Sequence, residues 1–551
     1  MPSIKEWLKR KKLKYKGLEK YEGPKEEASL TFVNDKDRII KTRLMEYGVW
    51  YDGDGDELLN FYTGQNIVGY NYEPWYSRNK KSYFWSISAT ENDIKRSHSG
   101  QPRNIVDTLV SIMRFPIIKG GSLEDENNAV NNNLINILKD SKLNNIYKKE
   151  QMPMTLVEGW GCYKINWDKA VRDYPIPVYY KADNVDFIYT MGRITGVVFK
   201  DYYTDRQSRR YMLAETRRIG LNDKGERTLI IENELFRTME GNMEYVNTAD
   251  FSEVPELAGT EKHIEIGPFD KLLAVPCIFF GSSDRLGGYG RSIFTGKIDL
   301  FDDLDQALSQ ASNAVRKSTP LEYFNSEYME RDANGVLKQP QSYDRKYITV
   351  TGNRDANGTV QGDAVQVTQP NINFKEYSDE AIAIMLQIIN GVMSPATLGI
   401  DIAKKDNAEA QREKEKVTIF TRNAIIDAET EILKDLCSQL LCAYEFMRTG
   451  MITAKDYDIS VQFSEFADDS FENKIEKLGA AFDAENISEE MFMKKLYGDS
   501  LSRADYNKEL QWLKDTHTAH RTQAFEGAAG GGQNTPGMLN NMLGGADEDE
   551  I

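Results

Sequence analysis

The feature that most constrains the fold is a succession of three helical patterns in the second half of the chain. In the first, apolar residues recur at helical spacing from Ile298 to Ala311. The second runs from about Phe374 to Met393, and the third runs from about Ala408 to Thr449 before Gly450, which suits a C-cap. The third would be roughly 60 Å long at 1.5 Å per residue. Because 408–416 is nearly all polar, we expect only its second half to lie in a core.

A segment with strand patterns separates the first two helical patterns. The first helix should begin near Ser292 and end near Pro320. Two Ala-Asn-Gly turn signals follow, with short strands at Tyr347–Val350 and Val365–Thr368. We therefore expect a small β-rich insertion between two helices. Ser394 and Pro395 should break the second helix.

The first 280 residues mix helical and strand patterns. An aromatic-rich region spans Tyr47 to Trp85, which is typical of a packed domain or a subunit interface. Helical periodicity appears at Ile105–Met113 and again at Val130–Leu138, and strand-like alternation then dominates from Trp160 to Arg210. A further apolar strand is expected at Val275–Phe280. These patterns predict an α+β fold.

Beyond the long helix, the sequence predicts a strand at Tyr457–Phe463 and then helices capped at Ser470, Ser488 and Ser502. After Phe525 the chain is rich in Gly and Asn and ends in four consecutive acidic residues before Ile551. Too few apolar groups are present there to form a core, so a disordered acidic tail is expected.

Charge and hydropathy limit the classes of function. The 551 residues carry a net charge of −17, which argues against a protein that grips DNA by neutralising phosphates. An acidic surface still suits a conduit to which a polyanion must not adhere, although acidity also simply favours solubility. No apolar run reaches the roughly 18 residues of a membrane span, and the N-terminus does not resemble a signal peptide. The four scattered cysteines are expected to be reduced thiols in a cytoplasmic protein.

One acidic loop superficially resembles a calcium-binding loop. Asp52, Asp54 and Asp56 alternate as the ligands of such a loop would. However, Glu57 stands where a glycine is needed, and Thr63 stands where a bidentate glutamate is needed. We therefore do not predict a calcium site.

Other catalytic or metal-binding motifs fail in similar ways. The segment after Gly290 resembles a phosphate-binding loop, but Ile298 follows Lys297 where a Ser or Thr should hold magnesium. His517 and His520 are three apart on an expected helix and could share a metal, but we expect instead that they belong to a polar helix face. The sequence names no catalytic residue, cofactor or metal, and predicts a protein that is not an enzyme.

The order of these features, together with short local matches, carries a family resemblance. The matches are Trp50-Tyr51-Asp52-Gly53 followed by 58–64, the helix 104–113, the glycine-containing stretch 158–168, the strand 274–280, Gly290-Arg291-Ser292, and the Ser394-Pro395 break before the long helix. With this succession, residues 40–450 resemble the portal protein of tailed double-stranded-DNA bacteriophages.

The resemblance implies an α+β subunit with a helical stem. Its parts would be an N-terminal basic arm (1–40), an α+β wing (41–291), a first stem helix (292–317), a β-containing clip (318–370), a second stem helix (371–393), a tunnel loop (394–407), a long wing helix (408–450), a helical crown (451–525) and a disordered acidic tail (526–551).

The resemblance also implies a function and partners. About twelve copies would close into a ring at one capsid vertex, and double-stranded DNA would pass transiently through its channel during packaging and ejection. The partners would be the major capsid protein, the scaffolding protein, the large terminase subunit and a head-tail adaptor protein. The protein would reside in the virion, and in the host cytoplasm during assembly. The basic N-terminal helix could contact scaffold, capsid or DNA.

Two sets of residues are candidates for contact with the channel. Asp302, Asp303 and Asp305 crowd the start of the first stem helix and would form an acidic wall, although acidic residues near a helix N-terminus are also favoured by its dipole. Lys404 and Lys405 lie in the tunnel loop and would touch phosphates. They could equally be ordinary surface lysines.

Two other functions remain open. A different self-associating virion or scaffold protein would use the same helices, and an enzyme of unknown chemistry would use the aromatic-rich region as a pocket.

Overall fold

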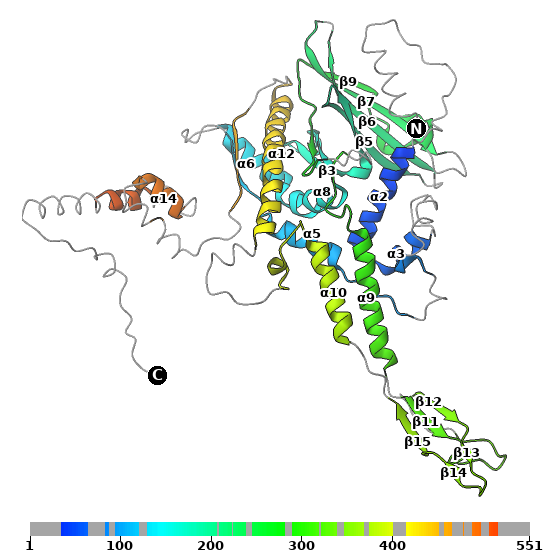
Figure 1. The fold of residues 1–551 in the computed structure, drawn as a ribbon. Coiled ribbons are helices and arrows are strands. Elements are labelled where there is room, and N and C mark those ends of the chain that lie inside the picture. Colours follow the sequence, from blue (N-terminus) through cyan, green and yellow to red (C-terminus); the bar gives the residue numbers. More distant parts are fainter. Residues whose placement is uncertain are drawn as a thin grey trace, which may run out of the picture. The chain divides into compact units, whose positions relative to one another are not determined.

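The computed structural model describes residues 35–63, 83–87, 94–120, 129–205, 209–222, 224–238, 245–281, 289–318, 321–338, 346–368, 374–400, 415–450, 457–464, 478, 488–497 and 506–515 (Figure 1). The chain divides into two units, Met1–Ser464 and Glu465–Ile551. The predictions for the basic arm, for Lys404 and Lys405, for most of the crown and for the acidic tail lie outside the described residues.

The first unit is a mixed α+β structure, as the sequence predicts. Its described α-helices are α2 (Asp35–Asp52), α3 (Gly55–Thr63), α5 (Gln101–Ile112), α6 (Ala129–Ser141), α7 (Leu143–Ile146), α8 (Met152–Glu158), α9 (Ile298–Lys317), α10 (Phe374–Ile389) and α12 (Lys416–Thr449). Its described strands are β1 (Ile117–Gly120), β2 (Gly161–Asn166), β3 (Ile176–Lys181), β4 (Val185–Thr190), β5 (Arg193–Thr204), β6 (Arg210–Leu221), β7 (Arg227–Thr238), β8 (Tyr245–Thr248), β9 (His263–Ile266), β10 (Ala274–Cys277), β11 (Leu321–Asn325), β12 (Lys346–Val350), β13 (Asn353–Arg354), β14 (Val360–Gln361), β15 (Val365–Thr368) and β16 (Ile459–Gln462).

Two antiparallel sheets organise the first half of this unit. One has the order β10-β2-β3, and the other has the order β4-β5-β6-β7-β8, with β9 also paired to β7. In the first, Tyr163 of β2 pairs with Val275 of β10 and with Tyr179 of β3. These three side chains are buried on one face of the sheet, and Cys162 and Lys164 of β2 are buried on the other, so the central strand is covered on both faces and joins the main core.

A buried ion cluster connects the two sheets. Lys164 Nζ of β2 lies 2.8 Å from Glu215 Oε2 of β6, and Arg217 Nε donates to Glu215 Oε1 at 2.7 Å. The Arg217 guanidinium also donates to the carbonyls of Ile165 and Leu273 at 2.9 and 2.6 Å. Burial alone would raise the pKa of Glu215, but Arg217 and Lys164 hold it below its ordinary value. The cluster thus joins the two sheets through ion pairs and hydrogen bonds in which each buried charge has an oppositely charged partner.

The long helix α12 packs on the main core with its second half. It contacts β10, β16, α6 and β2, and most of its apolar residues from Ile425 to Ala443 are buried. Near its start, Val417 and Phe420 remain 40% and 62% exposed. The prediction that only the second half of this helix is core is therefore confirmed for its described residues. Gly450 ends the helix with a φ of +73°, a conformation that glycine adopts without strain.

The helix predicted to form the first stem helix begins later than expected. The expected start was near Ser292, whereas α9 begins at Ile298. Ser292 Oγ accepts a bond from the Phe294 amide at 3.0 Å and so holds a turn, and Gly296 has a φ of +77°, which is not helical. The apolar spacing identified Ile298, Phe301 and Leu304 as buried, but Leu308 of the same pattern is exposed, and the spacing did not show these local turns.

The β insertion and the returning helix match the prediction. Strand β11 pairs in parallel with β12 and antiparallel with β15, and β13 pairs with β14. Helix α10 then runs antiparallel to α9 and contacts it, as Figure 1 shows in green and yellow-green. Lys297 Nζ donates to the Asn390 carbonyl at 2.9 Å, which ties the start of α9 to the end of α10. Helix α10 ends at Ile389, earlier than the predicted Met393, and Gly391 just beyond it has a φ of +74°, so the helix stops before Ser394 and Pro395. A short 3₁₀ turn, Pro395–Leu398, follows.

In the second unit, helix α14 (Glu489–Tyr497) begins at the predicted cap. Ser488 Oγ accepts a hydrogen bond from the Met491 amide at 3.3 Å. The caps predicted at Ser470 and Ser502 lie outside the described residues.

None of the described helices in either unit combines the length and the apolar character that a membrane span requires.

Candidate functional site

Two of the predicted channel-wall carboxylates anchor a segment of the same chain. Asp302 accepts hydrogen bonds from the amides of Phe84 and Trp85, at 2.8 and 3.3 Å. Asp305 accepts from Trp85 Nε1 at 3.0 Å, from the Ser99 amide at 2.8 Å, and contacts His98 Nδ1 at 2.7 Å. We call the described residues 83–87 and 94–99 the strap. These carboxylates hold the strap on α9.

This burial is incompatible with a channel-wall role for Asp302 and Asp305. Both side chains are buried within the subunit, and Asp305 is fully covered. Burial, partly offset by the two backbone amides, raises the pKa of Asp302 to about 6. A carboxylate enclosed by its own chain cannot present its charge to a polyanion in a channel. The expectation for these two residues is therefore corrected: their role is to position the strap.

Asp303 differs from its two neighbours because it lies on the exposed side of α9. Partial burial and the nearby carboxylates of Asp299 and Glu380 raise its pKa. Asp299 also lies on α9, and Glu380 lies on α10; both are exposed. The helix pair therefore carries a small acidic surface contributed by both helices.

The same helix pair exposes apolar side chains. On α9, Leu308 is 38% and Val315 is 47% exposed, and on α10, Ile382 is 41% and Leu386 is 39% exposed. The inward face of α10 is distinct, since Ala381, Ile388 and Ile389 are buried. We call the exposed residues Leu308, Val315, Ile382 and Leu386 the stem stripe. The inward apolar faces of α9 and α10 are covered within the chain, but the stem stripe on their outward faces is left exposed to solvent.

The small sheet that lies between α9 and α10 in the sequence, β11 to β15, is also exposed. Every residue of β15 is exposed, and so are residues 348–350 of β12. Ile348 and Val350 lie on one face of the sheet, and Val365 and Val367 lie on the other, because their cross-strand partners on β11 alternate. Both faces of this sheet therefore present β-branched apolar side chains to the surroundings.

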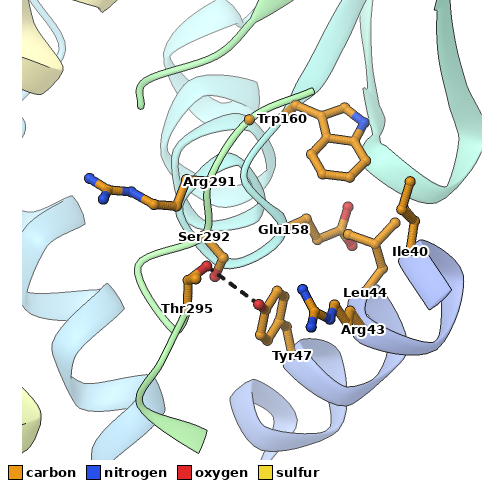
Figure 2. Close-up of a pocket in the computed structure, with 10 residues that line it drawn as sticks. Ile40, Arg43, Leu44, Tyr47, Glu158, Trp160, Arg291, Ser292 and Thr295 are labelled. Atoms are coloured by element: carbon orange, nitrogen blue, oxygen red, sulfur yellow. Dashed lines mark hydrogen bonds between the residues drawn. The ribbon is translucent and has the colours of Figure 1, made fainter. Parts of the chain in front are cut away.

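A small hollow lies where α2 meets the turns before α9 (Figure 2). It is lined by Ile40, Arg43, Leu44, Tyr47, Glu158, Trp160, Gly290, Arg291, Ser292 and Thr295. Tyr47 Oη and Thr295 Oγ1 are 3.4 Å apart across it. Its volume of about 40 Å³ is far below the several hundred Å³ of a typical ligand pocket. This hollow therefore has room for water but not for a small-molecule substrate.

Glu158, beside this hollow, has a structural partner. Its Oε2 accepts from the Ala182 amide at 2.6 Å. Burial raises the pKa of Glu158 to about 7, although Lys181 and this hydrogen bond act in the opposite direction. Just beyond it, Gly159 has a φ of +95° and packs directly against the backbone of Arg291 and Ser292. The turn before α9 therefore packs so closely on Gly159 that this position has no room for a side chain.

The rejected calcium loop forms a helix junction. Helix α2 ends at Asp52 and α3 begins at Gly55, and Asp54 Oδ1 accepts from the Asp56 amide at 2.8 Å. Among the described residues, no group of three or more His, Cys, Asp or Glu side chains is placed to hold a metal ion. The four cysteines are buried and form no disulfide. His517 and His520 lie outside the described residues.

No protein-family model matches the chain, and no curated protein is similar enough to count as a relative.

Proposed function

We propose that this chain is the subunit of a portal ring of a tailed double-stranded-DNA bacteriophage. The observation that carries the proposal is the antiparallel pair α9 and α10, which leads into and returns from a small exposed sheet and is followed by the long helix α12. The α+β region before this pair and the broken segment after it stand in the order expected of a wing and a tunnel loop. In this proposal α9 and α10 are the stem, and β11–β15 form the clip.

The stem stripe supports self-association into a ring. In a ring, one side of each subunit contacts a different side of the next, so each stem pair has two neighbours. Apolar side chains on both the inward and the outward faces of a helix pair suit that arrangement, because neighbouring copies would remove the outward ones from water. A ring of about twelve copies remains the expectation from the resemblance.

The acidic surface supports a conduit. We propose that the channel wall is formed by Asp303, Asp299 and Glu380. Asp302 and Asp305, which the sequence also suggested for it, are buried. Such a wall repels phosphates and so prevents DNA from adhering during transit. Lys404 and Lys405 stay the proposed tunnel-loop contacts, where two cations per subunit would give weak, salt-dependent binding.

The exposed clip supports docking of other proteins. Its apolar side chains on both faces fit the proposed contacts with the large terminase subunit during packaging and with a head-tail adaptor protein afterwards. The major capsid and scaffolding proteins are the proposed partners of the wing. The protein would lie at one vertex of the virion, after assembly in the host cytoplasm. The packaging energy would come from the motor, so we propose no catalytic site for this chain.

The decisive experiment measures the mass of the purified protein and averages negative-stain images of it. We expect a closed ring of several hundred kilodaltons with a central hole, since one chain has a mass of 62.9 kDa. The double variant Ile382→Asp, Leu386→Asp should yield folded monomers. Met191→Asp is the matched control, because Met191 is 99% exposed on the turn between β4 and β5, outside the stem stripe.

Two results would argue against the portal. Wild-type protein that stays monomeric at high concentration would contradict it directly. Open or variable assemblies, or labelling of the capsid away from one vertex, would instead favour a different self-associating virion or scaffold protein. Unchanged rings in the double variant would remove the stem stripe from the interface.

A further inference from the structure

A fully buried carboxyl group lies inside the first unit, away from the stem. Glu429 is in the middle of α12, and its side chain has no exposed surface. Gln151, the last residue of the π-helical turn η2 (Tyr147–Gln151), donates from Nε2 to Glu429 Oε2 at 2.9 Å. Within the described part of the chain, Glu429 makes no ion pair, and no charged group acts on it. A carboxylate ion in such a place would be very unfavourable.

The remaining oxygen of each partner is buried and lacks a hydrogen bond. These two atoms are Glu429 Oε1 and Gln151 Oε1. An ionised carboxylate and an amide oxygen are both acceptors, so neither can satisfy the other. A single proton on the carboxyl group changes this, because a neutral acid donates as well as accepts. An acid and a primary amide then form two parallel hydrogen bonds.

We propose that Glu429 carries a proton at neutral pH and forms a two-bonded acid–amide pair with Gln151, which latches α12 onto η2. In this pair, Gln151 Nε2 donates to Glu429 Oε2, and the Glu429 hydroxyl at Oε1 donates to Gln151 Oε1. The pair lies within one subunit, so its test stands whether or not the protein forms rings.

The surroundings favour the neutral acid. Tyr147 of η2, Tyr163 of β2 and Cys277 of β10 are the titratable groups coupled to Glu429, and burial raises the pKa of each, so all three are uncharged. The cation Arg422 acts on Tyr147, and one of its nitrogens donates to the Ser464 carbonyl. Burial raises the pKa of Glu429 to about 8, and the bond from Gln151 lowers it only in part.

The sign of the pH dependence follows from linkage. The unfolded glutamate has a pKa of about 4.3, so the folded state holds the proton more tightly than the unfolded state. The stabilisation is complete below that value, declines as pH rises, and is lost above about pH 8. Across this window, opening of α12 should become up to about tenfold easier per pH unit. The latch is therefore closed under acidic and neutral conditions and loosened under alkaline ones.

The test compares Glu429→Gln with Glu431→Gln in the full-length protein. Gln at 429 keeps two hydrogen bonds with Gln151 but cannot titrate, whereas Glu431 is an exposed residue of the same helix that pairs with Lys434 at 2.9 Å. Hydrogen exchange of α12 amides, corrected for intrinsic rates, is measured from pH 5 to 9. Infrared difference spectra at pH 7 report the carbonyl stretch of a protonated carboxyl group directly.

We expect Glu429→Gln to flatten the pH dependence of α12 exchange and to remove a protonated-carboxyl band that wild type and Glu431→Gln retain. Equal pH profiles in all three proteins, with no band lost, would overturn the proposal. Stoichiometric retention of a metal cation by wild type but not by Glu429→Gln would also overturn it, because a cation would then satisfy the buried oxygens. If Glu429→Gln does not fold, the infrared band is followed in the wild-type protein as pH is raised. A protonated-carboxyl band that persists at pH 7 and disappears at alkaline pH would support the proposal, and the absence of such a band at pH 7 would overturn it.

Discussion

Removing the Asp305 carboxylate should release the strap from α9. Asp305→Ala leaves three donors without their acceptor: Trp85 Nε1, the ring nitrogen of His98 and the Ser99 amide. Each buried donor left unpaired costs about 1–3 kcal/mol. The donors from His98 and Ser99 are only partly buried, so water replaces some of the loss. We therefore expect a local destabilisation of about 3 kcal/mol, which corresponds to a roughly 100-fold larger opening constant for the strap.

Hydrogen exchange measured by mass spectrometry on peptides covering 83–87 and 94–99 is the suitable assay, because it reports local opening in a chain too large for two-state unfolding. Asp303→Asn is the matched control, since Asp303 is the exposed neighbour on the same helix and should change stability by less than about 0.5 kcal/mol. Asp305→Asn keeps one acceptor oxygen and should fall between the two. Equal strap protection in Asp305→Ala and Asp303→Asn would refute the anchoring role.

Three further outcomes are expected. Glu215→Ala removes the carboxylate that Lys164 and Arg217 share, so it should lower the free energy of unfolding by about 3–5 kcal/mol and reduce the denaturation midpoint. An unchanged midpoint would contradict a stabilising role for the ion cluster. Gly159→Ala should have a clearly lower melting temperature than Gly192→Ala. Both glycines have a positive φ, but only at Gly159 would the added methyl group lie 2.9 Å from backbone atoms, at a cost of roughly 1–3 kcal/mol. Similar melting temperatures would show that the backbone around Gly159 can move to accept the methyl group. Replacing Lys404 and Lys405 with Ala should leave rings intact but impair packaging or retention of DNA, and packaged genomes of normal length would exclude the tunnel-loop assignment.

The elements that the sequence predicted best are those specified by local patterns. The stripe of α9, the strand at Val365–Thr368 and the cap at Ser488 each depend on residues within a few positions of one another. The late start of α9 was missed because Gly296 and the Ser292 hydroxyl impose turns that apolar spacing does not report. Periodicity identifies a buried face more reliably than it identifies the first residue of a helix.

The roles of the acidic residues were harder to predict, because they depend on segments far apart in the sequence. Asp302 and Asp305 accept their hydrogen bonds from the strap, which lies more than 200 residues earlier in the chain. A local signal was nevertheless present: Asp305 follows Phe301 by four positions and so lies on the buried stripe. Glu429 stands in the same relation to Ile425. An acidic residue in phase with a buried stripe thus indicates an internal partner, whereas one out of phase, such as Asp303, indicates a surface role.

This distinction bears on how the proposed channel tolerates DNA. If all three aspartates of α9 faced the lumen, the acidic wall would be continuous along one helix. With two of them facing inward, the proposed wall would comprise Asp303 and Asp299 of α9 together with Glu380 of α10, so its charge density would depend on the spacing of these two helices. The Lys297 bond to the Asn390 carbonyl and the buried residues between the helices maintain that spacing. The buried carboxylates would then act on the channel indirectly, because they hold α9 in the position from which Asp303 is exposed.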